Sequence, residues 1–309
     1  MALRSLYDVP APAKLNLFLH VVGRRPDGYH LLQSVFVLID WCDQLHFERR
    51  DDGLLQRHDL GPALPADDLC LRAARALQAA SGCTLGADIS IDKQLPWGAG
   101  MGGGSSDAAS TLLALNHLWG LQLPQSRLLE LALALGADVP FFVRGHNAWV
   151  EGIGEQITPI ELPEEWFAVV KPAASINTQA IFSSPLLVRD TEAATLTGFL
   201  ACNASLQRRQ EQDTGHEAYG RNDLQPPAEA GCAEVAEAGA WLKAIFGNSR
   251  MTGSGSAVFA RAGRIVNDDG TERLPTASLP QALPAGRSMW AVKMCRSLKQ
   301  HPLVGWSSD

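Results

Sequence analysis

The sequence predicts a mixed α/β protein of the α+β type, in which strands and helices do not alternate regularly. A two-residue period marks strands, as in residues 13–22, where leucine and valine alternate with other residues. A period of three to four residues marks helices, as in residues 67–82, where Gly82 is the expected stop. The chain has 309 residues, 46% of them hydrophobic, which is enough to bury the cores of about two domains.

The first domain is expected over residues 1–162 and begins with the strand 13–22, which has one face toward the core. Strands 34–39 and 44–48 are expected to flank a turn at residues 41–43. A helix is expected after residue 104, with Ser105 or Ser106 as its cap and Gly120 after its end. The other elements expected here are the helix 67–82, a strand within 87–95, the helix 124–136 and two short strands within 148–160.

The second domain is expected over residues 163–309. It is predicted to contain a buried strand at 166–172, a helix at 232–247, a turn that leads into a strand within 249–261, and a last strand at 288–294. Residues 183–220 are polar and irregular, and we expect a surface segment there. Three prolines within 272–286 argue against a helix in that stretch, because an internal proline costs a helix about 3 kcal/mol.

Composition excludes several classes of function. The net charge of −7 disfavours a protein that binds nucleic acid through a basic surface. No run of about 18 apolar residues predicts a membrane span, and the first residues lack a signal-peptide core, so a cytoplasmic location is expected. The six scattered cysteines contain no CxxC pair and are expected to be reduced thiols rather than metal ligands: Cys42, Cys70, Cys83, Cys202, Cys232 and Cys295.

The stretch "LPWGAGMGGGSSDAAS" (residues 95–110) joins an expected strand to an expected helix. Backbone N–H groups of a glycine-rich loop and of a helix N-terminus can together bind phosphate. No lysine follows the glycines as a P-loop NTPase requires. The spacing Gly98, Gly100 and Gly103 also fits G-x-G-x-x-G, but the acidic residue that a dinucleotide site needs is missing, which leaves an NAD-type dehydrogenase as a remote alternative. A flexible connector before a capped helix is a second alternative.

Three stretches, in this order along the chain, resemble the three motifs of the GHMP kinase superfamily: "PAKLNLFL", "PWGAGMGGGSSDA" and "MTGSGSAVFA". The resemblance implies a two-domain GHMP kinase fold. Its N-terminal domain would be ribosomal-protein-S5-like and carry the ATP phosphate loop, and its C-terminal domain would be ferredoxin-like. The active site would lie in the cleft between the two domains.

The longer stretches "PAKLNLFLHVVGRRPDGYHLLQSVF" and "LALGADVPFFVRGHNAWVEGIGE" are similar to one branch of this superfamily. That branch phosphorylates the 2-hydroxyl of cytidine diphosphate methylerythritol in non-mevalonate isoprenoid biosynthesis. The resemblance therefore implies a small-molecule kinase that uses ATP and Mg²⁺. The alternatives are another GHMP small-molecule kinase, of the homoserine or mevalonate type, and a non-catalytic nucleotide-binding module on the same fold.

Lys14 and Asp138 match the catalytic lysine and aspartate of that branch. An aspartate can accept the proton of the attacking hydroxyl, and a lysine can keep the carboxylate ionised. From the residue pattern alone, Asp138 is a cap for a short helix with Pro140 in its first turn, and Lys14 is a surface lysine. A capping aspartate can also accept a proton, so the two interpretations of Asp138 are compatible.

The resemblance also implies binding residues, while it identifies no metal ligand. ATP-binding positions are Lys93, Pro96, Trp97, Gly98, Ala99, Gly100, Met101, Gly102, Gly103, Gly104, Ser105, Ser106, Thr252, Gly253, Ser254 and Gly255. Substrate-binding positions are Asn16, Tyr29, His30, Thr178 and Phe182, of which Tyr29 and Phe182 would stack on the cytosine. Asp68 stands where relatives usually have an asparagine. An amide both donates and accepts hydrogen bonds, whereas an ionised carboxylate only accepts them, so the resemblance does not imply a contact of Asp68 with the adenine of ATP.

Overall fold

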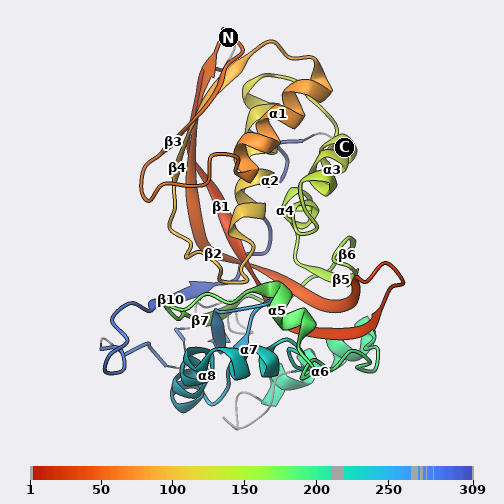
Figure 1. The fold of residues 1–309 in the computed structure, drawn as a ribbon, viewed down its shortest axis with the longest axis vertical. Helices are drawn as coiled ribbons and strands as arrows, with labels where there is room; N and C mark the ends of the chain where they lie inside the picture. Colours follow the sequence, from red (N-terminus) through yellow and green to blue (C-terminus); the bar gives the residue numbers. More distant parts are fainter. Residues whose placement is uncertain are drawn as a thin grey trace.

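The computed structural model describes residues 3–209, 219–265, 271, 274–275, 277–280 and 282–307. Figure 1 shows two units along the long axis, an upper one with helices on one side of a long sheet and a smaller lower one. The upper unit contains β1 (Ser5–Arg24), β2 (His30–Arg50), β3 (Leu55–Asp59), α1 (Leu69–Ser81), β4 (Gly86–Asp92), α2 (Gly103–Leu118), α3 (Gln125–Leu135), α4 (Val139–Arg144), β5 (Ala148–Gly152) and β6 (Gln156–Pro159).

The lower unit follows in the chain. It contains β7 (Glu165–Lys171), α5 (Thr178–Ser183), α6 (Leu196–Arg209), α7 (Gln225–Gly231), α8 (Ala233–Phe246), β8 (Arg250–Met251), β9 (Val258–Arg264) and β10 (Ala291–Arg296). Its strands form an antiparallel sheet in the order β10-β7-β9-β8. The predicted strands 166–172 and 288–294 and the predicted helix 232–247 are confirmed as β7, β10 and α8.

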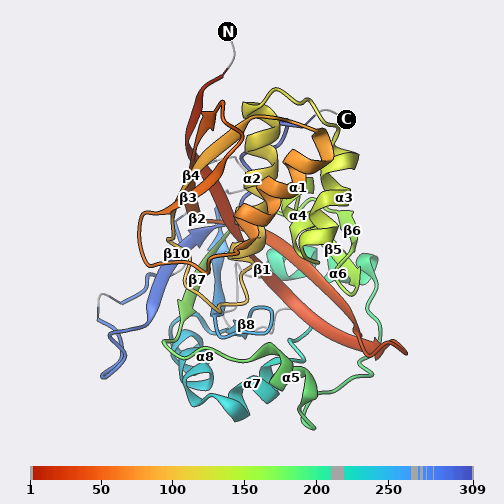
Figure 2. The ribbon, with the colours of Figure 1, turned by 45° about the horizontal axis from the view of Figure 1, so that its top comes forward.

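The strand β2 organises the upper sheet. It pairs along its length with β1, while β4 pairs with its second half and β5 with its first half, all antiparallel. In Figure 2 the β1–β2 hairpin extends from the helix-covered part of the sheet to the level of the lower unit. The predicted turn at residues 41–43 is wrong, because β2 runs through it and accommodates it with a register shift opposite Pro12 and Ala13.

The predicted core face of strand 13–22 is present, since Leu15 and Leu17 pack into one core, but the opposite face is not solvent-exposed, because both faces of the hairpin are buried. Phe36 and Leu38 pack into the core under the helices α1, α2 and α4, whereas the alternate residues Val35 and Val37 pack into a second core with β7 and β9. A strand covered on both sides buries polar residues as well, and Asn16 is 1% exposed. The second unit therefore packs directly behind the strand that carries Lys14 and Asn16.

The last residues of the chain return to the upper unit. The N–H of Leu298 donates to the carbonyl of Leu38, and the N–H of His301 donates to the carbonyl of Gly145. Leu303 is buried in the core under the helices. These contacts tie the end of the chain to the elements that surround α4.

The segment 183–220 is more regular than we expected. The helix α6 lies within 183–220, which we expected to be irregular, and the part at 210–218 is outside the described residues. Residues 272–273, 276 and 281 of the proline-containing stretch 272–286, where we expected no helix, are also outside the described residues. The six cysteines, all of which lie in the described part of the chain, form no disulfide with one another. Among the described residues, no helix is long and apolar enough to cross a membrane.

Candidate active site

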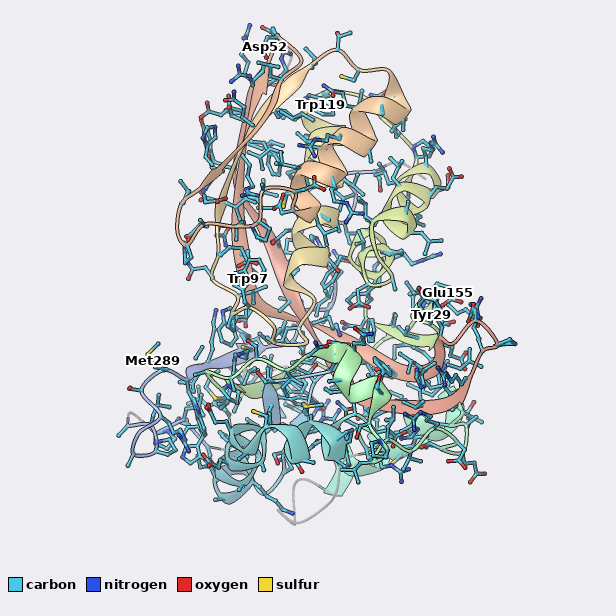
Figure 3. The ribbon with its side chains drawn as sticks, in the orientation of Figure 1. Tyr29, Asp52, Trp97, Trp119, Glu155 and Met289 are labelled. Carbon is cyan, nitrogen blue, oxygen red and sulfur yellow. The ribbon has the colours of Figure 1, made fainter. Side chains whose placement is uncertain are left out.

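Two cavities meet at the glycine loop between β4 and α2. The smaller cavity, of about 390 Å³, lies against α1 and the outer side of the loop. The larger cavity, of about 730 Å³, lies between the β1–β2 hairpin, the start of α4, and α5. Gly100 and Gly102 line both cavities, so the loop forms a thin wall between them. Figure 3 shows Trp97 and Tyr29, one residue from each cavity, on opposite sides of the molecule.

The structure brings most of the predicted site residues to these two cavities. The larger one contains Lys14, Asn16, Tyr29, His30, Gly100, Gly102, Asp138, Thr178, Phe182, Gly253 and Ser254. The smaller one contains Lys93, Ser105 and every residue from Pro96 to Gly104. Three predicted residues line neither cavity, and all three are buried: Ser106, Thr252 and Gly255.

The glycine loop and the turn at residues 252–255 are joined through their backbones. The N–H of Ser256 donates to the carbonyl of Gly98 at 3.0 Å, and the N–H of Ala257 donates to that of Ala99 at 3.2 Å. A Cβ atom on Gly100 would lie 2.4 Å from the carbonyl oxygen of Thr252, so only glycine fits there. The contact holds two parts of the chain, more than 150 residues apart, on one side of the site.

The helix α2 begins inside the glycine run rather than after it. Its N-cap is Gly102, with φ 73° and no side-chain cap, which corrects the expectation that Ser105 or Ser106 caps the helix. In the described part of the chain, the N–H groups of Gly103, Gly104 and Ser105 have no hydrogen-bond partner, as expected for a first helical turn. Unpaired N–H groups at the positive end of a helix dipole can bind an anion between the two cavities.

Lys14 lies at the floor of the larger cavity and is 3% exposed, so it is not the surface lysine that the pattern alone favoured. Its Nζ donates to Asn16 Oδ1 at 2.5 Å and lies 3.7 Å from Asp138 Oδ2. The ammonium also lies 4.5 Å from the centre of the Phe36 ring. Burial lowers the pKa of Lys14, and the nearby Asp138 carboxylate opposes that shift.

Asp138 occupies the N-cap position of α4, with Pro140 in the first turn. Asp138 therefore lies at the helix-cap position that the residue pattern predicted. Its carboxylate, however, makes no cap hydrogen bond, and its side chain is one-third exposed in the larger cavity. A carboxylate in this place can face both the Lys14 ammonium and a bound hydroxyl.

Lys93 is held between two buried carboxylates. Its Nζ pairs with Asp43 Oδ2, and it lies 2.7 Å from Asp107 Oδ2. Asp43 also accepts the N–H groups of Gln94 and Leu95 at 2.7 Å each. Burial, together with the nearby Asp43, raises the pKa of Asp107 to about 8, although Lys93 favours its charged form. This buried cluster fixes the start of the glycine loop and the first turn of α2.

Asp68 has local partners that suit a carboxylate. It is the N-cap of α1 and accepts the N–H of Leu71 at 3.0 Å. Its Oδ1 also lies 3.1 Å from a guanidinium nitrogen of Arg57. Asp68 lines the smaller cavity, but its carboxylate is already engaged by the N-terminus of α1 and by Arg57.

The far end of the larger cavity carries aromatic rings. The Phe182 ring stacks on the His30 ring, with centroids 4.9 Å apart and planes at 27°. Tyr29 is 61% exposed at the rim, where its side chain has room to contact a ligand. The hydroxyls of Thr178 and Ser254, which line the same cavity, are hydrogen-bonded at 2.8 Å.

Three residues around the site were not predicted from the sequence. Asp43 lies in the segment that we took for a turn, so its burial could not be foreseen. Asp107 follows the serines of the glycine motif, and its position one turn into a buried helix is a signal that could have been used. Arg189, which binds the ring of His30, lies in a segment without periodicity, and no pattern marks it.

Comparison with known proteins places this chain in a family. Residues 68–146 match the model of the GHMP kinases N terminal domain. The chain is 63% identical over 307 residues to 4-diphosphocytidyl-2-C-methyl-D-erythritol kinase of Methylibium petroleiphilum, covering 99% of this chain and 100% of that protein.

Solved structures show the same relationship. A crystal structure of 4-(cytidine 5'-diphospho)-2C-methyl-D-erythritol kinase is 35% identical, with a TM-score of 0.71 over 84% of this chain and 91% of that one. Homoserine kinase from Cytophaga hutchinsonii shares the fold at 15% identity, with a TM-score of 0.59 over 96% of this chain and 95% of that one. The two-domain GHMP kinase fold is therefore confirmed, and the chain belongs to the 4-diphosphocytidyl-2-C-methyl-D-erythritol kinase family.

Proposed function

We propose that the chain transfers the terminal phosphoryl group of ATP to the 2-hydroxyl of 4-diphosphocytidyl-2-C-methyl-D-erythritol. The observation that carries the proposal is the meeting of two cavities at one glycine loop, with Lys14 and Asp138 3.7 Å apart beside it. The smaller cavity would hold the nucleoside of ATP and the larger one the acceptor. The transferred group would pass across the loop from one to the other.

Phosphoryl transfer depends on positioning and on stabilising negative charge. The free N–H groups of Gly103, Gly104 and Ser105 would bind the phosphates of ATP at the positive end of α2. The acceptor hydroxyl would lie next to Asp138, which would take its proton as the new O–P bond forms. Lys14 would keep Asp138 ionised and face the charge that develops on the transferred group.

Magnesium binds oxygen ligands and usually takes few protein side chains when it binds a triphosphate. The first turn of α2 offers such oxygens: Ser105 lines the smaller cavity, and the buried Ser106 hydroxyl has no hydrogen-bond partner in the described part of the chain. These residues fit a Mg²⁺–ATP complex, in which the ion would neutralise phosphate charge.

The larger cavity favours a substrate with a base over a small acid or alcohol. Tyr29, His30 and Phe182 lie at its far end, and homoserine and mevalonate contain no ring that would use them. The ion pair at Lys14 favours an enzyme over a nucleotide-binding module without activity. The mainly antiparallel sheets leave no Rossmann unit for an NAD-type dehydrogenase within the described residues.

We further propose that residues 1–162 and 163–309 are separate domains. Each segment carries one of the two sheets, which supports the division. The return of residues 298–303 to the upper unit means that the last segment would stabilise the first domain as well.

Measuring ADP release with diphosphocytidyl-methylerythritol, homoserine and mevalonate side by side tests the substrate. We expect turnover only with the first, and activity with homoserine alone would overturn the proposed substrate. Asp138→Asn keeps the size of the side chain and removes the base. We expect it to bind ATP normally and to lose most turnover, and near-normal turnover would exclude Asp138 as the base.

A further inference from the structure

Arg189 joins two parts of the larger cavity that are far apart in the sequence. Its Nε–H donates to His30 Nε2 at 3.2 Å, and Nη2 donates to the carbonyl oxygens of Phe182 at 2.8 Å and Ser184 at 3.0 Å. Nη1 donates to the carbonyl of Leu187 at 3.0 Å. One half-buried guanidinium thus fixes the end of α5 and the chain after it against the first residue of β2.

The direction of the first hydrogen bond decides which nitrogen of His30 carries its proton. An arginine side chain stays protonated and can only donate, so His30 Nε2 must accept. The proton of the neutral imidazole then lies on Nδ1. No other hydrogen bond joins the His30 ring to a described residue, and the ring lines the cavity. The group that His30 can offer to a ligand is therefore an Nδ1–H donor.

The surroundings of His30 also favour its neutral form. Burial is the main factor that lowers its pKa, and the positive charges of Arg189 and Arg24 lower it further. Asp27 and Tyr29 line the same cavity from the hairpin turn, and Phe182 covers the ring. In a neutral ring whose Nε2 accepts a hydrogen bond from Arg189, Nδ1 carries the proton and can only donate.

We propose that Arg189 is a positioning residue that holds His30 as the Nδ1–H tautomer, so that the ring donates a hydrogen bond to an acceptor atom on the pyrimidine of the substrate. The identity of that ligand rests on the proposed function. Cytosine offers its ring N3 and its carbonyl O2 as acceptors, whereas the N3 of uracil carries a hydrogen. A fixed donor directed at N3 favours cytidine over uridine, because an unmatched polar pair in a binding site is unfavourable.

The tautomer can be measured on the whole chain without substrate. In a sample labelled with ¹⁵N-histidine, the His30 signals are assigned by comparison with His30→Gln. At pH 7.5 we expect a protonated Nδ1 and an unprotonated Nε2 in the parent protein. A proton on Nε2 of the parent would overturn the proposal, whatever the variants do.

Arg189→Met removes the hydrogen bond and the charge together. We expect loss of the fixed Nδ1–H signal and a rise of about fivefold to tenfold in KM for the cytidine substrate, the effect of one hydrogen bond of about 1 kcal/mol. We expect KM for ATP and kcat to change by less than about twofold. An unchanged tautomer with an unchanged KM contradicts the proposal, and Arg189→Lys serves as a milder variant if the methionine protein does not fold.

Arg24→Gln is the matched control. Arg24 also lowers the pKa of His30, but its Nε donates to the carbonyl of Gly28 at 3.1 Å and not to His30. We expect the Nδ1–H tautomer to persist in this variant, and its loss would show that charge rather than the hydrogen bond fixes the ring. If the parent protein does not phosphorylate the cytidine substrate, the proposed function fails, while the NMR result still decides the role of Arg189.

Discussion

Replacing Gly102 with alanine tests whether the glycine loop must approach Lys14 closely. Gly102 has φ +73°, a conformation that costs other residues about 1–2 kcal/mol. The added Cβ would lie 3.0 Å from the ring of Phe142, so either that ring or the loop must move by a few tenths of an ångström, and it would just touch Lys14 Cε at 3.4 Å. Crowding in a packed site costs about 1–3 kcal/mol more. We therefore expect the free energy of unfolding to fall by about 2–5 kcal/mol.

Gly82→Ala separates backbone strain from crowding. Gly82 has nearly the same backbone angle, φ +65°, but a Cβ there would have nothing within 4 Å. It follows α1 and is remote from Lys14 and Asp138. We expect this variant to lose about 1–2 kcal/mol of stability from strain alone and to keep its turnover.

Urea unfolding and steady-state ADP release should be measured on both variants. A displacement of 1 Å in a reacting group can cost about 100-fold in rate, so a shift of a few tenths in the loop beside Lys14 is expected to cost Gly102→Ala about tenfold in kcat. The reasoning is refuted if Gly102→Ala keeps kcat within about twofold of the parent. It is also refuted if Gly82→Ala loses as much turnover as Gly102→Ala, because strain alone would then account for the loss.

Two further predictions concern buried charges. Lys93→Met should lower the free energy of unfolding by about 3–5 kcal/mol, because it leaves the buried Asp43 carboxylate without its cation. Asp107→Asn should cost much less at pH 7.5, because the raised pKa of Asp107 already keeps it mainly neutral at that pH. Urea titrations that give equal losses for the two variants would contradict this. Burial lowers the pKa of His301 to about 3, so its contribution to stability is present above pH 6.5 and is lost as the pH falls toward 3. Between pH 7.5 and 5.5 the parent should lose about 1.4 kcal/mol that His301→Asn does not lose, and equal losses in the two proteins would refute the assignment.

Local periodicity predicted the elements whose burial follows a simple rule. The helices α1 and α8 were predicted from apolar residues at a spacing of three to four, α3 from a leucine-rich run that ends at Gly136, and the strands β7 and β10 from short, largely apolar runs. The β1–β2 hairpin was only partly predicted. Its two faces pack into different cores, so the polar Lys14 and Asn16 are buried beside leucines, and no single-face pattern describes that arrangement.

In the candidate site, too, residues within a local motif could be predicted, whereas residues brought together by tertiary packing could not. The glycine loop could be identified as a phosphate-binding site from the sequence, because its chemistry lies within one short stretch. Asp43, one partner of Lys93, could not be identified, because it lies 50 residues before Lys93 on another strand. Arg189 is a still clearer case, since its partner His30 is 159 residues away and only tertiary packing brings them together. Groups that hold site residues in place thus left weaker signals in the sequence than the loop itself.

The position of the glycine loop explains why these supporting residues matter for the proposed reaction. Gly100 and Gly102 separate the two cavities with backbone alone, so a phosphoryl group could pass between bound nucleotide and acceptor without crossing a layer of side chains. A wall this thin has little rigidity of its own. Its rigidity must come from the Lys93 cluster at the start of the loop, from the 252–255 turn that packs on Gly100, and from the cores behind β1. The distance between Lys14 and Asp138 is therefore set by residues outside the chemistry, and substitutions there should lower kcat before they abolish folding.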